Sequence, residues 1–264
     1  MSHLRYPSDL TDSQWHLIKG LLPPPKRRGR PRLDLREVID AISYVLKGGI
    51  QWRMMPTDCP CWQSAYGYFR RWRKDGTWRR IHDALRAVSR RAAGRHKHPT
   101  AGCLDSQSVR TTEAAAPETR GNDANKRVKG RKRHVLVDTL GLLLAVAVTA
   151  ANVQDKAGAL VALRRRGGGG KKLRRIWADG AYRTECGHLA SWMNLHRIAL
   201  TAVTRPAGQR GFAVLPRRWV VERTFGWLCQ SRRLSKDYER LAETSEALIY
   251  VAMTRLMLRR LAPK

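Results

Sequence analysis

Three acidic side chains in this strongly basic chain have the residue type and placement to hold a metal ion. Asp105 ends the strand-like stretch of AGCLDSQSV (101–109), and Asp179 ends that of LRRIWADGAY (173–182). Glu222 is the single carboxylate of RRWVVERTFGWL (217–228). Hard divalent cations take oxygen ligands, and two-metal phosphoryl transfer needs carboxylates that converge from different elements. Taken together, the three residues predict such a site.

The segments that carry these carboxylates are predicted to alternate strands with helices. Residues 101–109 and 173–182 each indicate a strand that ends in an aspartate, and 133–150 indicates two strands folded back at 138–141. Asp138 and Asp155 are then a turn residue and a helix cap. The remaining expected elements are a helix after residue 155, a basic loop over 164–172 and a strand over 196–203.

The segment 217–228 is predicted to open a helix. Val221, Phe225 and Leu228 fall at positions i, i+4 and i+7, so that face packs inward. Arg218 and Glu222 lie one turn apart on a neighbouring face, at the edge of the core. An exposed ion pair between them is the alternative to a catalytic role for the glutamate.

The charge balance indicates a polyanionic partner. The chain has 264 residues, with 52 Lys and Arg against 21 Asp and Glu, a formal net charge of +31. Such an excess repels itself in a compact fold unless a polyanion binds, and nucleic acid is the obvious one. A ribosomal-type binder and a merely solvated basic surface are the alternatives.

The sequence favours a cytoplasmic, nucleoid-associated protein. The N-terminus has no apolar signal core, and no run approaches the roughly 18 apolar residues of a membrane span. Cys59-x-Cys61 and Cys186-x-His188 have one-residue gaps, which do not match the usual spacing of zinc ligands. We therefore expect reduced thiols and no zinc site.

Residues 1–98 are predicted to form a helical domain. Thr11 and Gln14 form a capping box, Asp34 and Glu37 form another, and Thr77 caps a fourth helix. The helix over 62–74 is aromatic on one side and basic on the other, as expected of the recognition helix in a helix-turn-helix unit. An ordinary helical bundle with a basic face is the alternative.

The segment KRRGRPR (26–32) joins the first two helices. Its Arg-Gly-Arg-Pro core is extended and narrow, and is able to lay guanidinium groups in an A·T-rich minor groove. A plain basic linker is equally compatible with these residues.

Nearly the whole chain resembles the DDE transposases of bacterial insertion sequences, in the IS-five group of the IS-four-like superfamily. The resemblance is carried by LDSQSVRT (104–111), KGRKRHVLVDTLGLLLAV (129–146), WADGAY (177–182), RRWVVERTFGWL (217–228) and RRLSKDYER (232–240). LTDSQWHLI, GIQWRMMP and YFRRWRKDGTW resemble the N-terminal helical part of these proteins.

The resemblance implies an α/β fold, with a ribonuclease H-like mixed-sheet catalytic core over 99–264. It also implies a catalytic triad of Asp105, Asp179 and Glu222 that binds two Mg²⁺ ions, with Mn²⁺ as a substitute. The expected activity is binding of the element's terminal inverted repeats in double-stranded DNA, followed by strand cleavage and strand transfer. Because two ends react together, a homodimer is expected; Asp138 and Asp155 are not expected to be catalytic.

Two positions depart from the family motif. Leu215 stands where the family has Tyr, and Cys229 stands where it has Lys or Arg. Arg232 or Arg233, about one turn further on, is expected to reach the same phosphate; otherwise end-binding is weakened. The expected DNA-binding residues are Arg28, Arg30, Arg32, Arg70, Arg71, Arg73, Lys74, Lys129, Arg131, Lys132, Arg133, Arg218, Arg232 and Arg233.

Two other functions stay open. One is a transposase-derived DNA-binding regulator without catalysis, which loss of any one of the three acidic residues would favour. The other is a ribonuclease H-like nuclease or resolvase without rejoining activity, which would not need a helix-turn-helix unit to read specific ends.

Overall fold

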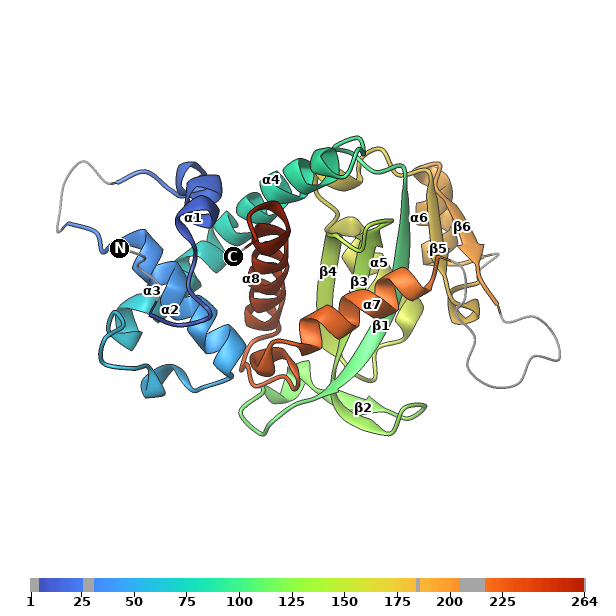
Figure 1. The fold of residues 1–264 in the computed structure, drawn as a ribbon. Helices are drawn as coiled ribbons and strands as arrows, with labels where there is room; N and C mark the ends of the chain where they lie inside the picture. The colour runs from blue at the N-terminus through green and yellow to red at the C-terminus, as the bar shows by residue number, and fades with distance from the viewer. Residues whose placement is uncertain (1–4, 26–30, 184–185, 205–216, 264) are drawn as a thin grey trace.

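The N-terminal part of the chain is helical. The computed structural model describes residues 5–25, 31–183, 186–204 and 217–263. The first four α-helices wind beside the C-terminal helix at one end of the molecule (Figure 1). They are α1 (Asp12–Ile18), α2 (Leu35–Gly48), α3 (Trp62–Lys74) and α4 (Thr77–Ala92), with short 3-10 turns η1 (Lys19–Leu21) and η2 (Trp52–Met54) between them.

The ends of these helices follow the expected chemistry with small differences. Thr11 forms the predicted capping box, and α2 ends at Gly49, whose φ of 74° suits glycine. Asp34 caps α2 through the N–H of Arg36, 2.8 Å away, in place of the predicted box. The fourth cap lies one residue before the predicted one, because Gly76 takes the cap position and Asp75 accepts from the backbone N–H of Thr77.

A six-stranded mixed sheet fills the other end of the molecule. The strand order is β2-β3-β1-β5-β6, with β4 also paired to β3. β1 runs antiparallel to β3 and parallel to β5, and β5 runs parallel to β6. The α/β class with a helical N-terminal part is thus confirmed. The strands are β1 (Ala101–Arg110), β2 (Gly121–Asp123), β3 (Val128–Asp138), β4 (Leu143–Ala150), β5 (Arg175–Ala178) and β6 (Ala199–Ala202).

Helices cover both faces of this sheet. α5 (Asp155–Arg164) and α6 (His188–Leu195) share a hydrophobic cluster with one face, which includes Leu104 and Leu136. α7 (Trp219–Cys229) lies across the other face, over β1 and β3 (Figure 1). Asp155 is the first residue of α5 rather than its predicted cap, which is Gln154. Short 3-10 turns are η3 (Pro117–Thr119), η4 (Gly168–Gly170), η5 (Gly180–Tyr182) and η6 (Arg232–Leu234).

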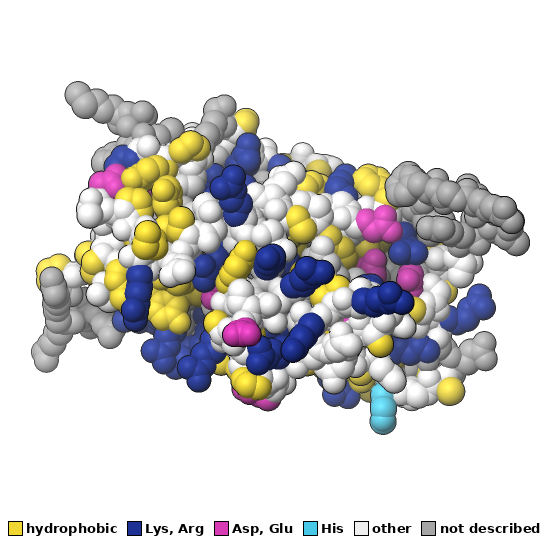
Figure 2. Space-filling view, turned by 90° about the horizontal axis from the view of Figure 1, so that it is seen from below, with side chains coloured by type: hydrophobic (Ala, Val, Ile, Leu, Met, Phe, Trp, Pro, Cys, Tyr) yellow, Lys and Arg dark blue, Asp and Glu magenta, His cyan; other side chains and the backbone are white. Residues whose placement is uncertain are grey.

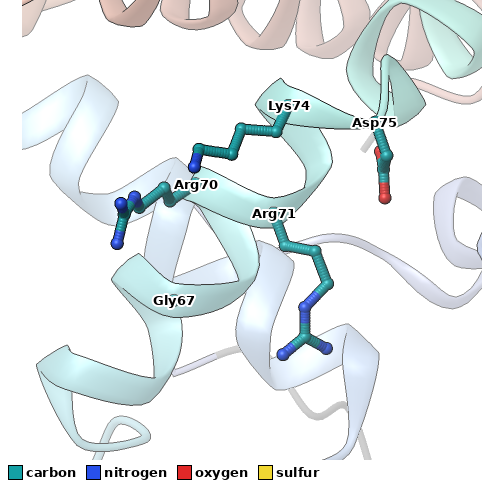
Figure 3. Close-up of a pocket in the computed structure, with 5 residues that line it drawn as sticks. All are labelled: Gly67, Arg70, Arg71, Lys74 and Asp75. Carbon is teal, nitrogen blue, oxygen red and sulfur yellow. The ribbon is translucent and has the colours of Figure 1, made fainter.

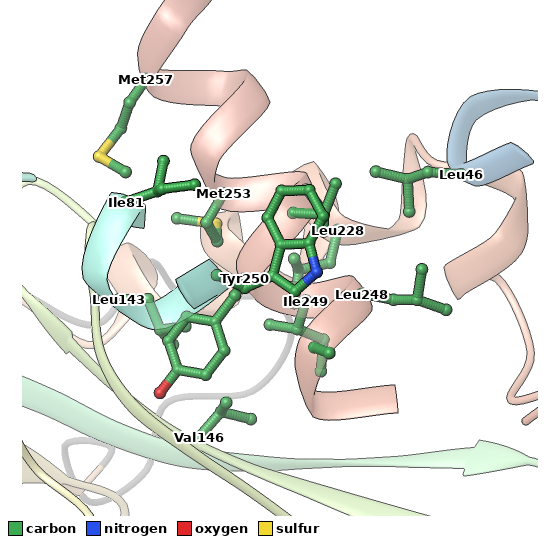
Figure 4. Close-up of a cluster of buried hydrophobic side chains, with 14 of the residues drawn as sticks. Leu46, Ile81, Leu143, Val146, Leu228, Leu248, Ile249, Tyr250, Met253 and Met257 are labelled. Carbon is green, nitrogen blue, oxygen red and sulfur yellow. The ribbon is translucent and has the colours of Figure 1, made fainter. Parts of the chain in front are cut away.

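The C-terminal helix α8 (Ala242–Leu261) joins the two ends of the molecule. It packs against α4 and β4, and its buried side chains meet apolar residues from both parts of the chain (Figure 4). One hydrophobic cluster therefore runs from the N-terminal helices to the sheet, and the division into domains at 98/99 stays a prediction. No helix in the described part of the chain is long and apolar enough to cross a membrane.

Candidate active site

Strand register places the two aspartates side by side. Cys103 on β1 pairs with Trp177 on β5 in a parallel ladder, so two residues further on Asp105 lies opposite Asp179. Asp105 accepts the backbone N–H of Ser106 at 2.7 Å. Asp179 follows β5 and accepts the backbone N–H of Ala181 at 2.7 Å. The parallel pairing therefore brings together carboxylates that are 74 positions apart in the sequence (105 and 179).

Helix α7 supplies the third carboxylate. Val221 and Leu228 are fully buried and Phe225 is 8% exposed, which confirms the predicted inward face. Glu222 lies on the neighbouring face, and its side chain is 48% exposed. The helix is held by apolar contacts with the sheet, so the glutamate is free to serve a site at the edge of that core.

A corner before α7 fixes the start of this helix over the sheet. Arg217 has a φ of 70°, which non-glycine residues rarely adopt. Its carbonyl accepts the Cys103 thiol at 3.1 Å, and its guanidinium carbon lies 4.4 Å from the centre of the Trp177 ring. Sequence reasoning missed this corner, because its contacts come from β1 and β5.

Arg218 lies among all three carboxylates. Its Nη2 atom is 3.3 Å from Glu222, 3.9 Å from Asp105 and 4.0 Å from Asp179. Burial raises the pKa of Asp105 to about 6, against the lowering effect of the Ser106 N–H and of Arg218. Lys126, which sequence reasoning also missed, lies close enough to lower that pKa slightly, and it donates to the Ser106 carbonyl at 3.3 Å.

The donor set fits a hard divalent cation. In the ranges that the structure describes, no group of three or more His, Cys, Asp or Glu side chains is arranged to hold a metal ion. At this site the Arg218 guanidinium lies among the carboxylates. Three carboxylates nevertheless carry more negative charge than one guanidinium offsets, and their oxygens are the ligands that Mg²⁺ and similar ions prefer.

The two other acidic candidates have structural partners. Asp138 is fully buried, pairs with Arg90 of α4 and accepts the backbone N–H groups of Leu140 and Leu142. Asp155 pairs with Lys132 at 3.0 Å and accepts the Ser106 hydroxyl at 2.8 Å, on the sheet face opposite α7. Neither side chain pairs with Arg218.

Several predicted DNA contacts are on the surface. Arg70, Arg71 and Lys74 are exposed on α3 and line a hollow of about 570 Å³. In Figure 3, Arg70 and Lys74 project from the same side of this helix. Arg73 is partly buried and donates to the Thr244 hydroxyl at 2.8 Å, which ties it to α8. Arg32, Lys129 and Arg232 are also exposed.

Basic side chains are numerous on one face of the molecule. Seen from below, Lys and Arg are spread between the helical end and a group of acidic side chains near the far end (Figure 2). Arg28 and Arg30 lie outside the described residues, as does Leu215, so the minor-groove role of 26–32 stays a prediction.

Four predicted DNA contacts are buried, and three of these side chains pair with acidic residues of the protein itself. Arg131 is fully buried and bonds Asp237, Ser245 and the Glu239 carbonyl. Lys132 is buried between Asp155 and Asp123. Arg233 is buried against Glu239, 2.7 Å away, so it does not reach a phosphate beside Cys229. Arg133 is also fully buried, and its Nη1 atom donates to the Leu234 carbonyl.

Comparison with known proteins identifies the family of this chain. Residues 10–82 match the family described as putative transposase of IS4/5 family, and residues 96–257 match the family described as transposase DDE domain. The match to the DDE domain identifies the mixed sheet as a ribonuclease H-like core.

Two proteins of Burkholderia cepacia are similar to this chain. An uncharacterized 16.2 kDa protein of insertion element IS402 is 36% identical over 112 residues, which cover 40% of this chain and 75% of that protein. A putative transposase for insertion sequence element IS402 is 32% identical over 146 residues, which cover 50% of this chain and 65% of that protein. Since the DDE match alone spans more than half of the sequence, the chain belongs to the DDE transposases of the IS4/5 type.

Proposed function

We propose that this protein binds the terminal inverted repeats of its insertion sequence and cuts and rejoins DNA there, with Asp105, Asp179 and Glu222 as ligands of two Mg²⁺ ions. The observation that carries the proposal is the convergence of these carboxylates, from β1, the end of β5 and α7, within 4.0 Å of one guanidinium. Three carboxylates around one guanidinium leave an excess of negative charge, which is unfavourable in the protein alone and which a bound cation would neutralise.

The chain's own residues prepare the site in three ways. Strand pairing and the Arg217 corner set the distances between the carboxylates, and Arg218 offsets part of their mutual repulsion. The net charge of +31 draws the phosphodiester toward them. When bound, divalent cations supply Lewis-acid charge at the attacking and leaving oxygens of an in-line phosphoryl transfer, and Mn²⁺ suits the same oxygen ligands.

DNA recognition is assigned to the N-terminal helices. The exposed residues Arg70, Arg71 and Lys74 form a basic surface on α3, and phosphate contacts from such a surface position the duplex. Because strand transfer joins two element ends to one target, we also propose a homodimer in the paired-end complex.

A DNA assay separates this function from its two rivals. The protein is incubated with a duplex that carries the element's own terminal repeat, with Mg²⁺ and with a second duplex as target. Cut ends joined to the target are the expected products. Binding without cleavage would identify a regulator, and cleavage without joining, equal on unrelated duplexes, would identify a nuclease.

A further inference from the structure

A buried arginine side chain with unpaired N–H donors lies on the same face of the sheet as Asp105. Arg133 on β3 is fully buried, and its Nη1 atom donates to the Leu234 carbonyl at 2.8 Å. Its Nε and Nη2 atoms have no hydrogen-bond partner among the described residues. Buried polar groups are almost always paired, and an unpaired buried charge is costly, so these donors indicate a missing acceptor.

The neighbouring arginine shows that this fold is able to satisfy a buried guanidinium. Arg131 lies two residues away on the same strand face, and its nitrogens bond Asp237, Thr119 and several carbonyls. Asp237 also acts electrostatically on Arg133, but it is already bound to Arg131 and Ser245. Within the described chain, therefore, no carboxylate forms an ion pair with Arg133.

Two neutral side chains cover this guanidinium. Gln107 of β1 is the register partner of Arg133, and its Oε1 atom lies 3.5 Å from Nη1. The Nε2 atom of Gln107 contacts the Sγ atom of Cys229 at 3.7 Å. Cys229 ends α7 and is exposed. A side-chain contact between β1 and α7 thus lies at the Nη1 end of the guanidinium.

This covered position lies next to the carboxylates. Gln107 follows Asp105 by two residues on β1, about 6.6 Å along the strand. Cys229 follows Glu222 by seven residues on α7, about 10 Å along the helix. The strand and the helix thus lead from the candidate active site to Arg133.

We propose that Arg133 binds a phosphate of the DNA strand next to the scissile one, and that the strand reaches it by displacing the contact between Gln107 and Cys229. The proposal rests on the proposed function, because it takes the strand's position from the three carboxylates. The unpaired N–H donors on Nε and Nη2 are adjacent, and a guanidinium with two such donors matches a phosphate better than any neutral ligand.

Cys229 serves as a reporter at the mouth of this site. In a variant with Cys59, Cys61 and Cys186 changed to Ser, the remaining thiols are the exposed Cys229 and the buried Cys103. Saturating duplex DNA should slow alkylation of Cys229 by iodoacetamide severalfold, measured by peptide mass spectrometry. Inorganic phosphate at the same phosphate concentration should slow it little, because only a bound strand holds the phosphate there. An unchanged rate with saturating DNA would overturn the proposal.

A charge swap tests the cation itself. Arg133→Gln should reduce the log–log salt slope of duplex binding by about 0.9, the value for one phosphate contact. Cys229→Lys in the same chain should restore the slope, and Arg133→Lys should retain it. A folded Arg133→Gln protein with the wild-type slope would contradict the proposal; if this variant does not fold, the alkylation result decides.

Failure of this inference is distinguishable from failure of the proposed function. A protein that cuts and joins terminal-repeat DNA while Arg133→Gln changes neither slope nor protection would refute only the Arg133 site. A protein that binds no DNA would refute both.

Discussion

The Nη2 atom of Arg218 lies 3.3 Å from the Oε1 atom of Glu222, and the same nitrogen lies 3.9 Å and 4.0 Å from Asp105 and Asp179. The pair with Glu222 spans one helical turn and is half exposed, and such pairs stabilise a protein by under about 1 kcal/mol. Stability therefore gives no reason to place these four charges together, whereas metal and phosphate binding does.

Asp138 is expected to matter for folding and not for chemistry. Asp138→Asn leaves acceptors for the Leu140 and Leu142 N–H groups but removes the buried partner of Arg90. Loss of one partner of a buried ion pair costs about 3–5 kcal/mol, which urea unfolding would measure. The folded fraction should still cut DNA at the wild-type rate, and an unchanged unfolding midpoint would contradict the structural role.

The sequence predicted the elements that carry the site better than the partners of its basic residues. Apolar stretches and the i, i+4, i+7 pattern located β1, β5 and α7, because burial of one face determines such patterns locally. The predicted end of the first strand at Asp105 was wrong, since β1 continues to Arg110 and pairs with β3 beyond that residue. Arg131 and Arg133 lie on the same strand face as Val135 and Val137, which indicates burial, but their charges masked this signal. Their partners, such as Asp237, lie about a hundred residues away, and no local pattern contains them.

The helix α8 and the short strand β2 were not predicted either. α8 is buried on most of its surface, so its apolar residues show little helical periodicity. β2 has three residues, too few for alternation to show. Both elements form only because neighbouring parts of the fold complete them.

Asp40 is expected to make stability depend on pH. Burial raises the pKa of Asp40 to about 7, from an ordinary value near 3.8, although it accepts the Leu10 N–H. Because burial disfavours the ionised carboxylate, protonated Asp40 stabilises the folded state relative to the unfolded chain. This contribution to the free energy of unfolding is fully present below about pH 3.8 and is lost as the pH rises through about 7. Asp40→Asn should remove that loss, seen as a smaller fall in the free energy of unfolding between pH 4 and 7. Equal pH profiles for the two proteins would refute the assignment.

The basic surface of α3 is expected to bind DNA phosphates. Changing Arg70, Arg71 and Lys74 to Ala should lower the log–log salt slope of duplex binding by roughly 0.9 for each phosphate that the variant no longer binds. Arg73→Ala is the matched control on the same helix, because Arg73 donates to Thr244 and should leave the slope unchanged. An unaltered slope in the triple variant would show that α3 does not contact DNA.

Glu222→Gln is the sharpest test of the site. Gln keeps the size and helix propensity of the side chain but removes the charge that would hold a hard cation. The helix should still fold, since Val221, Phe225 and Leu228 bury its inner face. Strand cleavage of terminal-repeat DNA should therefore fall by several orders of magnitude, while binding to the same duplex stays within a few-fold.

Asp155→Asn is the control for this measurement and is expected to cut DNA, because Asp155 pairs with Lys132 on the opposite sheet face. If Glu222 only pairs with Arg218, Gln at this position would leave cleavage nearly intact, since an exposed pair of this kind carries so little energy. That result would remove Asp105, Asp179 and Glu222 as the catalytic set. A loss of cleavage in both variants would instead mean that the assay reports folding, which circular dichroism of the two proteins would show.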